Sequence, residues 1–363
     1  MKKIRLTSIC SPKQWRTIPT KDLLDEGYPV YGANGVIGYC KEYNHTSDTI
    51  IIGCRGSCGN VNIARGKSYI NGNAMCLDDL SSDVDILYLY YFLQNYDFRS
   101  VISGTTIPQV TKQGLEKIDV VVSSKENQRE IVRQLQLLDS IIEERHKELR
   151  YFDALIKSRF IEMFGDPKRN PRKWDMVTVG DIATDVRYGT SRPATEGGKY
   201  PYLRMNNLTY EGYLDLTDLK HIDIPDNEVE KCVVRNGDVL FNRTNSVELV
   251  GKTCVYNLDS DMIIAGYIIR VRIDDRVLPV ILSSYLNSTV MKEQLRSMAK
   301  GAVNQANINA QELRSIPIYL PPITLQHEFA TFVEQVDKSK FEIQQSLEKL
   351  EILKKSLMQQ YFG

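Results

Sequence analysis

LEKIDVVVSSKENQREIVRQLQLLDSIIEERHKELRYFDALIKSRFIEMFG at 115–165 and LRSIPIYLPPITLQHEFATFVEQVDKSKFEIQQSLEKLEILKKSLMQQYFG at 313–363 are two copies of one segment, 198 positions apart. The copies align without a gap, match Gln128 with Gln326, and both end in Phe-Gly. A repeat of about fifty residues indicates a duplicated structural unit. Two copies in one chain predict a pseudo-two-fold body, the internal counterpart of a symmetric dimer.

Each copy is expected to contain one long helix of a coiled coil, because its apolar residues recur at alternating spacings of four and three. A helix of about 38 residues is roughly 57 Å long. Each helix alone would expose its apolar stripe, so we expect the two to pair with each other, antiparallel. Polar seam residues can fix the register of such a pair at some cost in stability. Here they are Arg145, Arg159, Lys340 and Lys354.

The segments in front of the helices are predicted to be mixed α+β heads. Short β-branched or aromatic runs, such as those at 49–52 and 267–271, alternate with Gly, Asn and Asp, and helical stretches are expected at 84–99 and 278–298. The predicted fold is therefore α+β, with two mixed α/β domains in a pseudo-two-fold arrangement, separated by two long helices that form an antiparallel coiled coil. The expected segments are a first head at 1–122, a first long helix at 123–165, a second head at 166–321 and a second long helix at 322–363.

Composition limits the classes of function. Lysine plus arginine equals aspartate plus glutamate at 46 each, so nucleic-acid binding requires local segregation of charge. Seven cysteines, an odd number, argue against a disulfide framework and favour a reducing cytoplasm. No apolar run approaches the ~18–20 residues of a membrane span, so no membrane association is expected.

Loops rich in glycine and asparagine next to arginine stand out in both heads. Arg, Asn, Ser and Thr side chains pair with base edges or hold phosphates, and glycine lets the backbone approach closely. The alternative is turn chemistry, in which these residues only close hairpins. The candidate DNA-binding residues are Asn34, Arg55, Ser57, Asn60, Asn73, Thr105 and Gln109 in the first head, and Arg192, Arg204, Asn206, Asn207, Arg243, Thr244, Asn245, Lys252, Asn304 and Gln305 in the second.

Enzyme and metal signatures fail on inspection. Gly251-Lys252-Thr253 resembles the end of a phosphate loop, but Ser246 stands where the leading glycine belongs. Cys54 and Cys58 have the spacing of a helical metal pair in a non-helical, glycine-rich run, and the four histidines are scattered. The sequence therefore predicts no catalytic residues, no metal site and no cofactor.

The succession of head, long helix, head and long helix resembles the specificity subunit of type I restriction-modification enzymes. The resemblance covers the whole chain and is carried by the two strand-helix repeats ending in Phe-Gly, the runs at 28–35, 104–109 and 237–245, and a shorter echo at Gly301. It implies that each head reads one half of a bipartite site in double-stranded DNA, and that the helices space the heads and dock two methyltransferase subunits. Nuclease-translocase subunits are a further implied partner, and the subunit itself is implied to be non-catalytic.

Two other functions remain open from the sequence. A coiled-coil scaffold with protein-binding heads would show no DNA sequence preference. An enzyme with an unrecognised site would show turnover by the isolated chain. The loops rich in arginine and asparagine and the duplicated frame favour DNA recognition.

Overall fold

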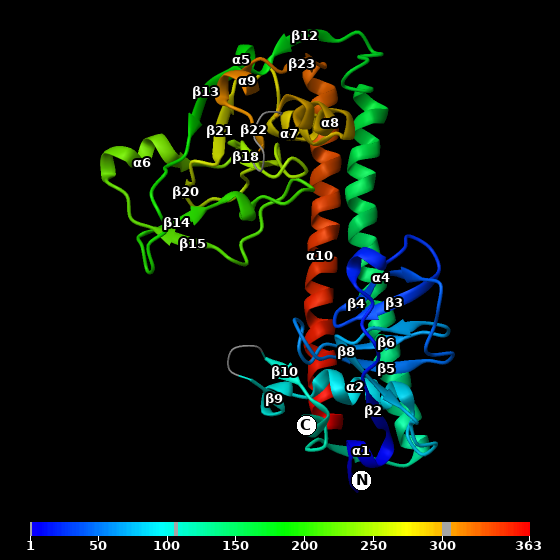
Figure 1. Cartoon of the computed structure of the whole chain (residues 1–363). Helices are drawn as coiled ribbons and strands as arrows, with labels where there is room; N and C mark the ends of the chain where they lie inside the picture. The colour runs from blue at the N-terminus through cyan, green and yellow to red at the C-terminus, as the bar shows by residue number, and fades with distance from the viewer. Residues whose placement is uncertain (1, 105–107, 300–305) are drawn as a thin grey trace. The chain divides into compact units, whose positions relative to one another are not determined.

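A computed structural model of the chain describes residues 2–104, 108–299 and 306–363. The chain forms two compact units, Met1–His146 with Gln344–Gly363, and Lys147–Ile343 (Figure 1). The division passes through both long helices, so each unit contains part of each helix.

The two long helices are α4 (Lys125–Phe164) and α10 (Ile323–Phe362), each of 40 residues. In the first unit they are antiparallel, because the Tyr361 hydroxyl donates to the Gln134 side chain and Lys354 Nζ lies 2.5 Å from Asp139 Oδ1. Residue numbers therefore increase along α4 in the direction in which they decrease along α10. The predicted antiparallel pairing of the helices is confirmed.

The second unit repeats this pairing with other residues. Lys340 Nζ lies 2.5 Å from Asp153 Oδ1, and the rings of Phe160 and Phe329 meet edge to face with centroids 5.5 Å apart. The ring of Tyr213, from the head, lies against the ammonium of Lys340, 3.5 Å from its centroid. The predicted polar seam lysines thus have acidic partners on the facing helix, and the head packs on one of them.

The first head contains mostly short strands. These are β1 (Lys2–Arg5), β2 (Ser11–Lys13), β3 (Tyr28–Gly32), β4 (Gly35–Cys40), β5 (Thr49–Gly53), β6 (Val61–Ala64), β7 (Tyr69–Ile70), β8 (Ala74–Asp78), β9 (Ile102–Ser103), β10 (Gln109–Val110) and β11 (Asp119–Val122). Its short helices are α1 (Leu6–Ile9), α2 (Ile86–Asn95) and α3 (Lys112–Leu115), with 3₁₀ turns at Thr20–Asp22 and Phe98–Ser100.

The second head has strands β12 (Asp175–Thr178), β13 (Ala183–Tyr188), β14 (Tyr200–Leu203), β15 (Lys220–Ile222), β16 (Val233–Val234), β17 (Val239–Asn242), β18 (Thr244–Asn245), β19 (Thr253–Val255), β20 (Met262–Ile264), β21 (Ile268–Ile273), β22 (Ala306–Asn307) and β23 (Pro317–Leu320). Its helices are α5 (Val179–Ile182), α6 (Asp226–Cys232), α7 (Pro279–Asn287), α8 (Thr289–Met298) and α9 (Ala310–Arg314), with a 3₁₀ turn at Met205–Asn207. The expectation of mixed α/β heads is confirmed.

The two heads share most of their strand pairings although their sequences differ, with β16 added in the second head and with β10 paired to β9 but β22 paired to β18. The antiparallel sheet β2-β8-β5-β6 of the first head has the strand order of β13-β21-β17-β19 in the second. Beside it, β3 pairs with β4 and runs parallel to β7, as β14 pairs with β15 and runs parallel to β20. β1 pairs with β11 before α4, and β12 with β23 before α10.

In the four-stranded sheets, the register of strand pairing matches the two heads residue by residue. Gly53 pairs with Ala74 between β5 and β8, and Asn242 pairs with Ile268 between β17 and β21. Cys76 lies two residues after Ala74, and Arg270 lies two residues after Ile268, so Arg270 is the counterpart of Cys76. The duplication seen in the helices therefore includes the heads, where the backbone is kept and the side chains have diverged.

A buried glutamine in the first turns of each long helix fastens that helix to its head. Gln128 accepts from the backbone N–H of Asp85 at 2.8 Å and donates to the carbonyls of Asp83 and Ser123. Gln326 accepts from Leu278 N–H at 2.9 Å and donates to the carbonyls of Arg276 and Pro321. Both side chains are fully buried. This shared role explains why the repeat matches these two residues.

Candidate nucleic-acid interface

Segments distant in the sequence converge at one edge of the first head: the β3–β4 turn, the loop after β5, the turn before β8 and strand β10. Asn60 Nδ2 donates to Asn34 Oδ1 at 2.7 Å, which joins the loop to the turn. The backbone N–H of Cys54 donates to the Asn73 carbonyl at 2.8 Å, and that of Val110 to the Cys54 carbonyl at 3.1 Å. We call this surface the first edge.

The second head builds the corresponding surface, the second edge, with other side chains. Lys252 Nζ donates to the Met205 carbonyl at 2.7 Å, in the place of the Asn60–Asn34 bond. The backbone N–H of Arg243 donates to the Tyr267 carbonyl, and that of Ile308 to the Arg243 carbonyl, both at 2.9 Å. The predicted loops of each head therefore meet at a single edge.

Most of the predicted residues that face outward lie at these edges. Exposed or half-buried there are Asn34, Arg55, Ser57, Asn60, Asn73 and Gln109 in the first head and Asn206, Arg243 and Asn245 in the second. Arg55 is exposed and has no hydrogen bond or ion pair with a described residue. Thr105, Asn304 and Gln305 lie outside the described residues.

Three predicted residues of the second head are buried and used internally. The Asn207 amide caps a turn by accepting from Arg204 N–H and donating to the Asp215 carbonyl, both at 2.8 Å. The Thr244 hydroxyl donates to Asn307 Oδ1 at 2.9 Å. Burial lowers the pKa of Lys252. These three side chains shape the second edge from within.

Two predicted arginines form ion pairs inside the second head. Arg192 Nη2 lies 2.7 Å from Glu228 Oε1, and Arg204 Nη2 lies 2.7 Å from Asp218 Oδ2. The Arg204 pair is next to the turn that carries Asn206, whereas the Arg192 pair binds its loop to α6. The Arg192 pair occupies Nε and Nη2 of its guanidinium.

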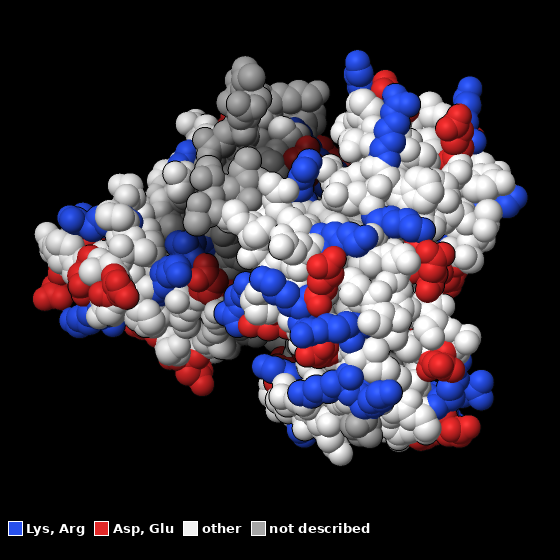
Figure 2. Space-filling model, turned by 60° about the horizontal axis from the view of Figure 1, so that its bottom comes forward, with Lys and Arg blue, Asp and Glu red and all other residues white. Residues whose placement is uncertain are grey.

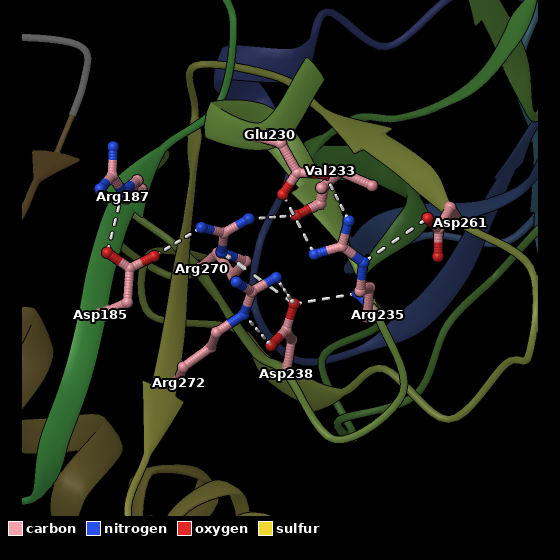
Figure 3. A network of polar contacts seen from close by, with 9 residues as sticks. All are labelled: Asp185, Arg187, Glu230, Val233, Arg235, Asp238, Asp261, Arg270 and Arg272. Atoms are coloured by element: carbon pink, nitrogen blue, oxygen red, sulfur yellow. Dashed lines mark hydrogen bonds and ion pairs between the residues drawn. The ribbon is translucent and has the colours of Figure 1, made fainter. Parts of the chain in front are cut away.

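The second head also contains a buried ion network (Figure 3). Arg270, 1% exposed, donates to the Val233 carbonyl and lies 2.5 Å from Asp185 Oδ2. Asp238 lies 4.0 Å from Arg270 Nε and 2.8 Å from Arg272 Nε. The network ties β21 to β13 and β17 in its own sheet and to β16 in the neighbouring sheet.

The side chain of Asp185 is held ionised within this network. Burial opposes its charged form, but hydrogen bonds from Arg187 and Arg270 outweigh that cost and lower the pKa of the carboxyl. An arginine inside the apolar strand run at 267–271 was the sequence signal for this network. That run is predicted from the sequence only as a strand.

One group of possible metal ligands lies in the first head, where His45, Cys76 and Asp78 have ligand atoms within 4.8 Å of one another. The contacts within the group are hydrogen bonds. His45 Nε2 lies 2.9 Å from Asp78 Oδ1, and the Trp15 indole donates to Cys76 Sγ at 3.1 Å. Burial raises the pKa of the Cys76 thiol to about 12.

Charge is mixed on the face shown in Figure 2, where lysine and arginine side chains are interspersed with aspartate and glutamate. All seven cysteines are free thiols. Among the described residues, no helix combines the length and apolar character needed to cross a bilayer.

A family model described as the type I restriction modification DNA specificity domain matches residues 1–150 and 171–354, once over each head and the greater part of its helix. The chain belongs to this family. The resemblance found in the sequence is therefore confirmed.

Two curated relatives are specificity subunits of type I restriction enzymes. The EcoKI subunit of Escherichia coli is 21% identical over 269 residues, which are 69% of this chain and 58% of the relative. The MjaIX subunit of Methanocaldococcus jannaschii is 25% identical over 186 residues, which are 44% of this chain and 42% of the relative. The chain thus spans about half the length of these relatives.

Solved structures agree with the fold. The crystal structure of the S subunit of a type I system from M. genitalium matches with a TM-score of 0.59 at 17% identity, covering 100% of this chain and 96% of its own. A chain from a structural study of complex assembly and conformational transition in the type I system matches with a TM-score of 0.57 at 18% identity, covering 99% and 97%. At these identities the likeness concerns the fold alone.

Proposed function

We propose that this chain is the non-catalytic subunit that selects the DNA sequence for a type I restriction-modification complex. Each head reads one half of a bipartite site through its edge. The observation that carries the proposal is the repeated edge, because one backbone arrangement presents different side chains in the two heads. Two readers with the same architecture and different chemistry suit a site whose halves differ in sequence.

We propose the same boundaries for the heads and the long helices as the sequence predicts. The exposed residues of the first and second edges are proposed as the contacts with DNA. The paired helices hold the heads and dock two methyltransferase subunits. Net neutrality is compatible with this role, since partner subunits can supply phosphate contacts. Linked readers on one frame gain affinity when the spacing of the half-sites matches.

The test is to express the chain with its methyltransferase subunits in a host free of restriction systems and to map methylated bases across the genome. Methylation at one bipartite motif with a fixed gap is the expected result. Replacing the chain with a variant that lacks the second head should abolish that motif. Methylation with no motif, or an unchanged motif without the second head, would contradict the proposal.

A further inference from the structure

The side chain of Arg243 at the second edge is held in a defined position. Its guanidinium carbon lies over the ring of Tyr188, 4.8 Å from the centroid. The Tyr188 hydroxyl accepts a hydrogen bond from the backbone N–H of Ala310 at 2.8 Å, which fixes the ring to the start of α9. A guanidinium stacked on an aromatic face loses less freedom when it binds a planar partner.

The hydrogen-bonding groups of Arg243 are only partly used within the protein. Nη1 lies 3.5 Å from the Gly266 carbonyl, at the limit of a hydrogen bond. Nε is buried, and neither Nε nor Nη2 has a hydrogen-bond partner among the described residues. The neighbouring Tyr188 and Tyr267 remain 41% and 50% exposed. An oriented guanidinium with unused donors beside exposed rings is suited to an external planar acceptor.

The first head has different chemistry at the same backbone position. Its counterpart of Arg243 is Cys54, which is buried in the core, and its counterpart of Tyr267 is Asn73. Gln14, the counterpart of Tyr188, donates to the Gly72 carbonyl at 3.2 Å, as Arg243 does to Gly266. The backbone hydrogen bonds at this position are therefore the same in both heads, and the side chain that the position carries differs.

We propose that Arg243 reads a guanine in the half-site of the second head and that Tyr188 is its positioning residue. The inference rests on the proposed function and specifies one contact within it. Two guanidinium donors match O6 and N7 of guanine in the major groove, the commonest specific contact of arginine with DNA. A phosphate contact would be sequence-independent and would not need a fixed orientation.

The experiment uses the full chain with its methyltransferase subunits and maps methylated motifs for wild type, Arg243→Lys, Tyr188→Leu and Tyr188→Phe. Arg235→Ala is the matched control. It removes a cation from the turn that precedes β17, at the opposite end of this strand from Arg243, where Arg235 pairs with Glu230. Circular dichroism and co-purification with the methyltransferase check folding of each variant.

Arg243→Lys and Tyr188→Leu should relax recognition at the same single guanine position, by roughly 10-fold or more in relative methylation, and leave the other half-site unchanged. Tyr188→Phe keeps the ring and should have a smaller effect, while Arg235→Ala should keep the motif. A uniform loss at all bases, a relaxed position without guanine, or an unchanged motif would each overturn the assignment. In every one of these cases a bipartite wild-type motif would still support the proposed function.

Discussion

Lys292 shows how burial of one residue makes the stability of the second unit depend on pH. Its side chain is almost fully buried, and Nζ donates to the Tyr210 carbonyl at 2.9 Å and lies 3.9 Å from the Tyr210 ring centroid. Burial, assisted by the charge of Lys157, lowers the pKa of Lys292 to about 7. Between this value and the ordinary lysine pKa near 10.4, the unfolded chain binds the proton and the folded chain does not. The contribution of Lys292 to the free energy of unfolding therefore increases as pH rises through this window.

Lys292→Met should accordingly be more stable than wild type at pH 6, by roughly 1–3 kcal/mol, because no charge is then buried. The difference should shrink as pH rises toward 9. Urea unfolding at pH 6, 7.5 and 9 measures it, with Lys338→Met, an exposed lysine of α10, as control. A difference between Lys292→Met and wild type that does not change with pH would refute the role of this ammonium.

Arg270 is the residue on which the ion network of the second head depends. Arg270→Met leaves Asp185 without its buried partner and removes a charge near Asp238, so we expect a loss of ~3–5 kcal/mol in the free energy of unfolding. Arg187→Met removes the exposed partner of the same Asp185 and should cost at most about 1 kcal/mol. The lowered pKa of Asp185 adds a contribution that is present above the ordinary aspartate pKa near 3.9 and is lost as pH falls below it. Equal costs for the two arginine variants in urea unfolding at pH 7 would contradict this ranking.

At the scale of elements, the matched glutamines decide where each long helix joins its head. Gln128→Leu and Gln326→Leu would each leave one backbone N–H and two carbonyls without a partner, and should cost ~2–4 kcal/mol. The exposed Gln136 and Gln345 lie on the same helices and provide the controls. Hydrogen exchange should show faster opening of Asp85 in the first variant and of Leu278 in the second. Costs no larger than those of the controls would mean that packing alone joins helix and head.

The long helices could be predicted from the sequence because the heptad spacing of the apolar residues and the duplication of the segment both indicate them. Apolar spacing also determines directly which face of a helix is buried. The common topology of the heads could not be predicted in this way. Many apolar residues satisfy the same buried strand position, as Ile52 and Phe241 do in equivalent strands, so the backbone is kept while the sequence diverges. At the edges, Arg243 and Asn60 were found because they lie within recognisable loops. Tyr188 and Gln14 were missed, since strand pairing alone brings them to those loops.

At the scale of the whole molecule, the continuity of the two long helices makes the separation of the half-sites adjustable. Both helices cross between the units, α4 after His146 and α10 after Ile343. Inserting one heptad into each helix at these points keeps the register of the pairing within each unit and adds ~10.5 Å of helix. If the helices act as the spacer, the gap in the methylated motif should grow by about three base pairs, at ~3.4 Å each, with both half-sites unchanged.

Insertion of a heptad into only one helix is the matched control. The two helices can then pair in their original register in one unit but not in the other. We expect this variant to lose methylation at both the original and the lengthened motif. Genome-wide mapping of methylated bases separates the outcomes. An unchanged gap after the double insertion would show that contacts other than the helices set the distance between half-sites, while reading by the individual edges would remain intact. A changed half-site would instead show that the frame and the edges are coupled.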